Sequence, residues 1–353
     1  MIMNNGSTER ECLKFTDVEK LSQDLNTDYN ELIYGESGLS RYSMNRILKN
    51  YAGMEKNFKI HAFFEHGIVI IDLVDEAFRV HEYLPSIVPS QYRYNILKKQ
   101  PNFKGAYTIG PFIHYANSLL TKDQIAEEKE RLGKNLLVFP SHSIAGMIKQ
   151  FDYEGFCNQI KEVAKDYDSV RICTYYMDVR LKHHLPYERE GFEIVTAGHF
   201  NDYNFLPRLK SIIQTSDMTM SNDIGSHLGY CIYLNKPHFL ASSDVKFSNQ
   251  KEHNHAIAYQ MGQVVKEKNK KSENIAKIKD LFSTYDDKIT TDQYELISYL
   301  WGFDCIKTPD ELKKIFLELD DNYSAIKYYF SQLNRLISLI KMKYINPKIK
   351  KIK

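Results

Sequence analysis

The segment from Ser216 to Leu240 limits the fold of this chain more strongly than any other part of the sequence. Its residues predict a strand over Met218–Met220, a small polar loop, a helix that begins near Ser226 and a second strand from Pro237. A helix N-terminus carries free N–H groups and partial positive charge, and open α/β sheets bind ligands at the carboxyl ends of their strands. The segment is therefore a candidate phosphate-binding loop. An ordinary strand-to-helix turn, capped by Asp223 or Ser226, is the alternative.

Composition and length exclude several classes of protein. The 353 residues allow two domains, and a hydrophobic content of 43% is enough for buried cores. A net charge of +2 is small for a dedicated nucleic-acid binder, so we expect no nucleic-acid partner. The five cysteines are scattered and form no CxxC pair, so neither a disulfide framework nor a metal site is expected. The first twenty residues are polar and no apolar run approaches the roughly 18 residues of a membrane span, so we expect a cytoplasmic protein.

Strand and helix patterns alternate over most of the chain, with short connections. The first part predicts three strands, over residues 59–64, 86–89 and 105–109. The second part predicts five strands separated by helices, over residues 136–139, 169–174, 193–196, 218–220 and 237–241. Apolar strands between helices indicate a parallel sheet covered on both faces. Beyond residue 272 the pattern is helical only, over residues 273–282, 291–301, 309–319 and 324–342.

Five short motifs follow one another in a fixed order: Glu65-His66-Gly67, Val88-Pro89-Ser90, Ile109-Gly110-Pro111, Phe139 to Ser143, and Ser221 to Pro237. Over residues 58–244 this order resembles the GT-B-fold transferases of bacterial surface-polymer synthesis. These include capsule and lipopolysaccharide glycosyltransferases and the glycerophosphotransferases of teichoic acid assembly. The chain departs from that pattern because only about three strands precede the linker, where a full acceptor domain has more.

The resemblance implies a GT-B-like α/β fold of two Rossmann-like domains with a helical C-terminal extension. Residues 1–120 would form a reduced acceptor-side domain, which a partner could complete. Residues 134–265 would form the domain that binds the nucleotide donor, and residues 266–353 the helical extension with its basic tail.

The same resemblance assigns roles to individual residues. His66 would be the general base, because a histidine near its ordinary pKa suits that task at neutral pH, and Glu65 would orient it or be the base itself. A loop histidine that caps a strand end is the alternative. Two loops would hold the donor phosphate and sugar, through Ser141, His142, Ser143, Ser221, Asn222, Gly225, Ser226 and His227. Gly198 and His199 would contact the nucleobase, since a glycine permits close approach.

Together these features predict a glycosyltransferase that moves a sugar from a nucleotide-activated donor to a surface-polysaccharide or glycolipid acceptor. It would be inverting, independent of metal and without a cofactor. Two alternatives stay open: an enzyme resembling nucleotide-sugar 2-epimerases, which predicts more carboxylates in the cleft, and a non-catalytic sugar- or nucleotide-binding component of a glycan assembly complex.

The tail from Lys341 to Lys353 carries six lysines and suits contact with anionic lipid at the inner face of the cell membrane. A solvated terminus is the alternative.

Overall fold

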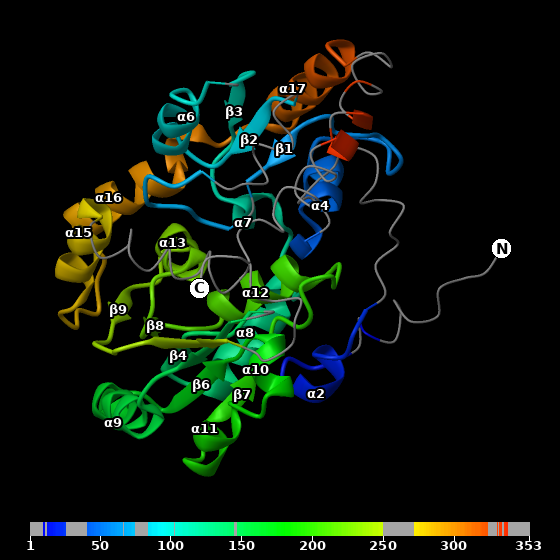
Figure 1. The fold of residues 1–353 in the computed structure, drawn as a ribbon. Coiled ribbons are helices and arrows are strands. Elements are labelled where there is room, and N and C mark those ends of the chain that lie inside the picture. Colours follow the sequence, from blue (N-terminus) through cyan, green and yellow to red (C-terminus); the bar gives the residue numbers. More distant parts are fainter. Residues whose placement is uncertain are drawn as a thin grey trace.

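The computed structural model describes residues 10, 13–25, 41–65, 67–74, 84–101, 103–144, 147–249, 272–323, 330, 332–333 and 335–337. These residues form two α/β units, each built on a parallel sheet, and a set of C-terminal helices that lies against both units (Figure 1). The α/β fold class predicted from the sequence is confirmed, and the described residues contain two parallel sheets, of three and of five strands.

The first unit is a small parallel sheet with the order β1-β2-β3. Its elements are β1 (Phe63–Phe64), β2 (Ser86–Val88), β3 (Ala106–Thr108) and the helices α4 (Met44–Tyr51), α6 (Gln91–Leu97) and α7 (Phe112–Tyr115). The predicted strand over residues 59–64 is only two residues long. Its hydrogen-bonded ladder with β2 begins where Phe63 pairs with Ser86. The ladder does not extend further toward the N-terminus because Pro85, the residue before Ser86, has no N–H to donate.

The second unit is a five-stranded parallel sheet with the order β7-β6-β4-β8-β9. Its strands are β4 (Asn135–Phe139), β6 (Ser169–Cys173), β7 (Glu193–Val195), β8 (Met218–Ser221) and β9 (His238–Leu240). Its helices are α8 (Lys122–Leu132), α9 (Tyr153–Val163), α10 (Tyr176–Arg180), α11 (Leu185–Arg189), α12 (Phe205–Gln214) and α13 (Ser226–Tyr233). The chain runs outward from β4 to β7 and then returns to β8 on the other side of β4. This reversal places a topological switch point between β4 and β8, at whose carboxyl ends such sheets bind ligands.

A two-stranded antiparallel ribbon accompanies the second sheet and was not predicted. It consists of β5 (Met147–Gln150) and β10 (Lys246–Asn249), which are nearly 100 residues apart in sequence. Both strands mix lysine with other polar residues and lack the alternating apolar pattern by which a half-buried strand is recognised.

The C-terminal helices α15 (Glu273–Phe282), α16 (Thr291–Trp301) and α17 (Pro309–Asp321) connect the two units. Helix α16 packs against α6 of the first unit and α13 of the second, and α17 packs against α4. Their buried residues belong to the same hydrophobic cluster as residues of both units. No helix among the described residues is both long and apolar enough to cross a membrane.

Two predictions from the sequence concern parts of the chain that are not fully described, and a third is not tested. Of the helix predicted over residues 324–342, the described residues 330, 332–333 and 335–337 are helical. The basic tail from Lys341 to Lys353 lies outside the described residues. The domain boundaries at residues 120, 134 and 265 stay predictions.

Candidate functional site

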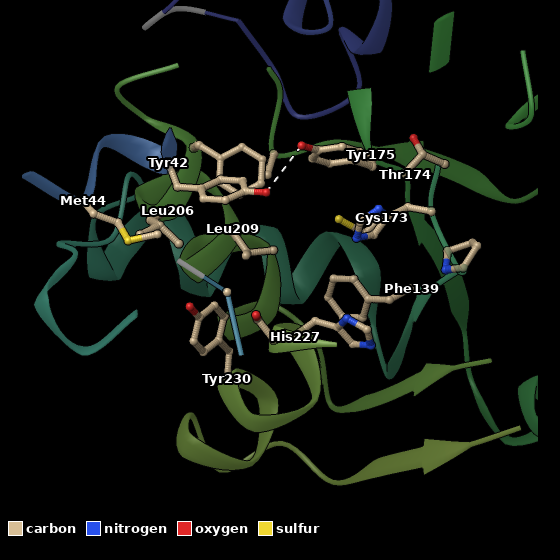
Figure 2. A pocket seen from close by; sticks show the side chains of 16 residues that line it. Tyr42, Met44, Phe139, Cys173, Thr174, Tyr175, Leu206, Leu209, His227 and Tyr230 are labelled. Carbon is tan, nitrogen blue, oxygen red and sulfur yellow. Dashed lines mark hydrogen bonds between the residues drawn. The ribbon is translucent and has the colours of Figure 1, made fainter. Parts of the chain in front are cut away.

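A pocket opens at the carboxyl edge of the second sheet, between that sheet and the first unit (Figure 2). The carboxyl ends of β4 and β6 and the segments that follow β4, β6 and β7 contribute Phe139, Pro140, His142, Cys173, Thr174, Tyr175 and Ala197. Helices α12 and α13 contribute Phe205, Leu206, Leu209, Ser226, His227 and Tyr230. The N-terminal part of the chain closes the pocket with Tyr42, Met44 and Gly67. The pocket therefore lies beside the switch point, and both units line it.

The pocket is mostly apolar, with a few polar groups. Its volume is about 160 Å³, and an engineered protein cavity of about 150 Å³ holds one benzene ring. The hydroxyls of Tyr42 and Tyr175 lie 3.4 Å apart and form part of the polar lining. An apolar cavity with a few convergent polar groups is the usual character of a small-molecule site. In this conformation the pocket has room for one ring of a ligand.

His227 lies in the first turn of α13 and points toward this pocket. Its ring stacks on Phe139, with centroids 4.9 Å apart and planes 19° apart. Burial lowers the pKa of His227 to about 3, and the neighbouring His142 and Lys149 act in the same direction. The imidazole is therefore neutral at neutral pH. Its Nε2 atom is buried and has no hydrogen-bond partner among the described residues, so a polar ligand atom would relieve an unsatisfied group.

His142 is the second histidine of the pocket. Its ring packs against Tyr175 with centroids 4.6 Å apart, and its Nδ1 lies 3.4 Å from the Ser143 carbonyl oxygen. Burial lowers the pKa of His142, Lys149 lowers it further, and Asp178 opposes them. Each histidine can donate one hydrogen bond or accept a proton, and neither brings a charge at neutral pH.

The first turn of α13 has free backbone donors. Gly225 is the N-cap residue, and no side chain caps the helix there. Ser226 Oγ accepts a hydrogen bond from the Ile68 N–H at 3.1 Å, which ties the start of the helix to the first unit. Asp223 and Ser226 thus do not cap α13 as the alternative interpretation of the sequence expected. Uncapped N–H groups at a helix start are suited to bind an anion.

Two other residues of the predicted phosphate loop are engaged inside the protein. Ser221 is buried, donates to the Asp223 carbonyl oxygen at 2.9 Å and lies 2.9 Å from His238 Nε2. Asn222 accepts from the Ser141 N–H at 2.7 Å and donates to Ser243 Oγ at 3.3 Å. These side chains position the loop, and neither lines the pocket.

The serines after β4 are engaged in a similar way. Ser141 Oγ donates to Asp223 Oδ2 at 2.9 Å, and Lys149 donates to the same carboxylate. Ser143 is fully buried, and its N–H donates to Asp178 Oδ2 at 2.9 Å. Burial alone would raise the pKa of Asp223, but Lys149 and Ser141 hold it below its usual value. The Lys149–Asp223 pair joins the ribbon to the phosphate loop.

No pattern in the sequence predicted the Lys149–Asp223 ion pair. Asp223 was visible only as a possible cap, and Lys149 lies in the unpredicted strand β5. Among the residues described, no three histidines, cysteines or carboxylates are grouped so that they could hold a metal ion.

Gly198 and His199 lie at the end of β7 but do not line the pocket. The His199 N–H donates to the Leu21 carbonyl at 2.9 Å, so the turn is covered by the chain around α2 (Val18–Leu21). Burial lowers the pKa of His199 to about 4. Ala197 is the residue of this turn that lines the pocket.

The predicted catalytic pair is only half described. His66 lies outside the described residues. Glu65 is 4% exposed and forms a two-point ion pair with the fully buried Arg93, with Nε 2.7 Å from Oε2 and Nη2 bonded to Oε1. Arg93 also donates to the carbonyls of Ile71 and Leu73 at 3.0 and 2.9 Å. Glu65 thus anchors the segment that leads from β1 to Gly67.

No protein-family model matches the chain, and no curated protein matches it. Among solved structures it is similar to the wall teichoic acid polymerase TagF, with 16% identity and a TM-score of 0.36, covering 82% of this chain and 69% of that one. It is also similar to S. aureus MnaA bound to UDP, with 11% identity, a TM-score of 0.38 and coverage of 87% and 83%. A UDP-glucosyltransferase from Polygonum tinctorium gives 11% identity, a TM-score of 0.28 and coverage of 84% and 68%. These identities and TM-scores are too low to assign a function to this chain.

Proposed function

We propose that this chain is a glycosyltransferase that takes a sugar from a nucleotide-activated donor and passes it to a surface-polysaccharide or glycolipid acceptor. The position of the pocket carries the proposal. It lies at the carboxyl edge of a parallel sheet, beside the β4/β8 switch point, with the uncapped start of α13 in its wall. Doubly wound sheets bind nucleotides at this place.

The two parts of the pocket suit two parts of a nucleotide. The side made of Ala197, Phe205 and Leu209 is apolar and suits a ring. The side made of Ser226 and His227 offers the N–H groups of α13 and the unpartnered Nε2 of His227 to a phosphate.

The chemistry proposed is inverting and independent of metal. The base removes a proton from the acceptor hydroxyl, whose oxygen then bonds to the anomeric carbon as the bond to the donor phosphate breaks. Negative charge develops on that phosphate, where the backbone N–H groups at the start of α13 would stabilise it. We assign the base to His66, which directly precedes the pocket residue Gly67 in sequence, and a positioning role to Glu65.

The transferase is favoured over the epimerase-like alternative by the absence of acidic groups. None of the described residues that line the pocket is an aspartate or a glutamate. The nearby Asp223 is already bonded to Lys149 and Ser141.

Nucleotide binding tests the donor site. The melting temperature is measured with CMP, CDP, UDP, GDP and their common sugar conjugates. A ligand at a hundredfold excess over its Kd adds about 2.7 kcal/mol to stability, so we expect one nucleotide to raise the melting temperature clearly. Ser226→Trp should abolish that rise, and Ser283→Trp, at an exposed serine that follows α15, should keep it. If no nucleotide raises the melting temperature of the wild-type protein, the assignment of the donor site is wrong.

Turnover separates the enzyme from a non-catalytic binding component. Release of the nucleotide from the identified donor is followed in the wild type and in His66→Ala. We expect the variant to lose turnover while its melting-temperature shift with the nucleotide is retained. Unchanged turnover would remove His66 from the mechanism, and absence of turnover in the wild type would favour the binding component.

A further inference from the structure

A second, larger cavity lies at the amino edge of the first sheet. Its volume is about 880 Å³, and the residues that precede β1, β2 and β3 line it together with the end of α17. The pocket of Figure 2 receives Gly67, which follows β1 at the opposite edge of the same sheet. The two cavities are therefore separate, and nothing in the proposed donor site requires the second one.

Aromatic rings dominate the walls of this groove. Tyr94, Tyr107, Tyr323 and Phe330 line it together with His61. The rings of His61 and Tyr323 are stacked face to face, with centroids 3.8 Å apart and planes 7° apart. Phe330 is 61% exposed at the edge. An aromatic ring whose face is open to the groove can bury the C–H face of a pyranose and leave its hydroxyls free for polar partners.

Polar groups stand beside these rings. Lys104 and Asn322 line the groove. Tyr107 is hydrogen-bonded to Glu318, and His61 lies 3.3 Å from Asp320. Hydroxyl groups of a sugar need donors and acceptors close to an apolar face, and this groove supplies both. The two carboxylates disfavour a polyanionic ligand, and the mixed lining disfavours an acyl chain.

We propose that this groove binds a neutral oligosaccharide. Its volume is several times that of the ring-sized pocket, so it has room for more than one sugar unit. Binding of the oligosaccharide is independent of the proposed transferase activity. That the groove holds a remote part of a growing acceptor rests on the proposed function.

The test is direct binding to the full-length chain. Maltohexaose, cellohexaose, chitohexaose and mannohexaose are titrated by saturation-transfer difference NMR. We expect at least one to bind, with ring protons in contact with the protein. Lys104→Ala combined with Phe330→Ala changes two exposed side chains of the groove and should weaken that binding at least tenfold. Tyr299→Ala removes an exposed tyrosine of α16 outside the groove and should leave the Kd unchanged.

Three outcomes would overturn the proposal. One is that none of the four oligosaccharides binds. Another is that binding survives both the double variant and Tyr323→Ala. The third is that a nucleotide that fills the first pocket displaces the oligosaccharide. Because the titration measures no turnover, its failure leaves the donor site intact, and failure of the nucleotide screen leaves the groove intact.

Discussion

The indole of Trp301 lies directly against Gly229. A Cβ atom added at Gly229 would be 2.2 Å from Trp301 Cε2 and Nε1, well inside van der Waals contact. Trp301 Nε1 also donates to the Ser226 carbonyl at 3.3 Å. The end of α16 is thus locked onto the first two turns of α13, which carry Ser226 and His227 of the pocket. The C-terminal helices support the proposed donor site, although none of their described residues lines it.

Gly229→Ala should destabilise the protein by about 1–3 kcal/mol, the usual cost of adding a methyl group to a packed core. Trp301 is 1% exposed and has no open side to which it can move. Chemical denaturation measures the free energy of unfolding. In a double-mutant cycle, Trp301→Phe should be less harmful in the Gly229→Ala background than in the wild type, because the smaller ring relieves the clash. Additive effects of the two changes would contradict the contact.

Arg93→Met should cost about 3–5 kcal/mol, because it leaves the Glu65 carboxylate buried without its partner. Urea unfolding of the two proteins measures the loss. The matched control is Lys165→Met, which removes an ion pair whose partners are 65% and 71% exposed and should change the free energy of unfolding little. Equal losses in the two variants would show that Glu65 and Arg93 contribute no more than a surface pair.

Local sequence signals predicted much of the fold. The bounds of α15 and α16 agree with the sequence to the residue. Capping boxes of Thr121 with Gln124 and of Thr308 with Glu311 can be recognised in the sequence, and both are present in the structure. Each of these features depends on residues three or four positions apart, so periodicity and capping rules suffice. The parallel direction of the strands followed from the alternation of strands and helices, whereas their order in the sheet was not predicted.

The details of the site depend on contacts between residues distant in sequence. Lys149 and Asp223 are 74 residues apart, and the strand that carries Lys149 has no apolar pattern. In the local sequence, His199 resembles a pocket residue because it lies in a turn that follows a strand. It is covered because Leu21, nearly 180 residues earlier, accepts its backbone hydrogen bond. Pairings of this kind are not encoded in any short window of the sequence.

The protein should lose stability as the pH falls below about 6.5, and His227 should contribute. The pKa of His227 is about 3 in the folded protein, whereas an unfolded histidine titrates near 6.5. Between pH 6.5 and pH 3 this histidine is protonated in the unfolded chain but not in the folded protein. The contribution of the neutral His227 to stability is therefore complete above pH 6.5 and declines as the pH falls toward 3. One such group gives a slope of up to about 1.4 kcal/mol per pH unit.

Urea unfolding of the wild type and His227→Gln at several pH values between about 7.5 and about 5 measures this slope. The variant has no imidazole to protonate at this position and should show a shallower decline. The remaining slope is assigned to the other buried histidines, such as His199. The same slope in both proteins would mean that folding does not lower the pKa of His227.

Gly198→Ala should change stability and Ala197→Val should change nucleotide binding, because only Ala197 lines the pocket. Gly198 has φ +92°, and an added Cβ would lie 3.0 Å from Arg208 Nη1 and 3.2 Å from the Leu21 carbonyl oxygen. Backbone strain in this region costs about 1–2 kcal/mol, so Gly198→Ala should lower the melting temperature. Its Kd for the donor nucleotide, measured by calorimetry where the variant is folded, should stay unchanged. Ala197→Val adds two methyl groups to a pocket with room for one ring and should raise that Kd at least tenfold. A raised Kd in Gly198→Ala would instead support the sequence-based prediction that Gly198 and His199 contact the nucleobase.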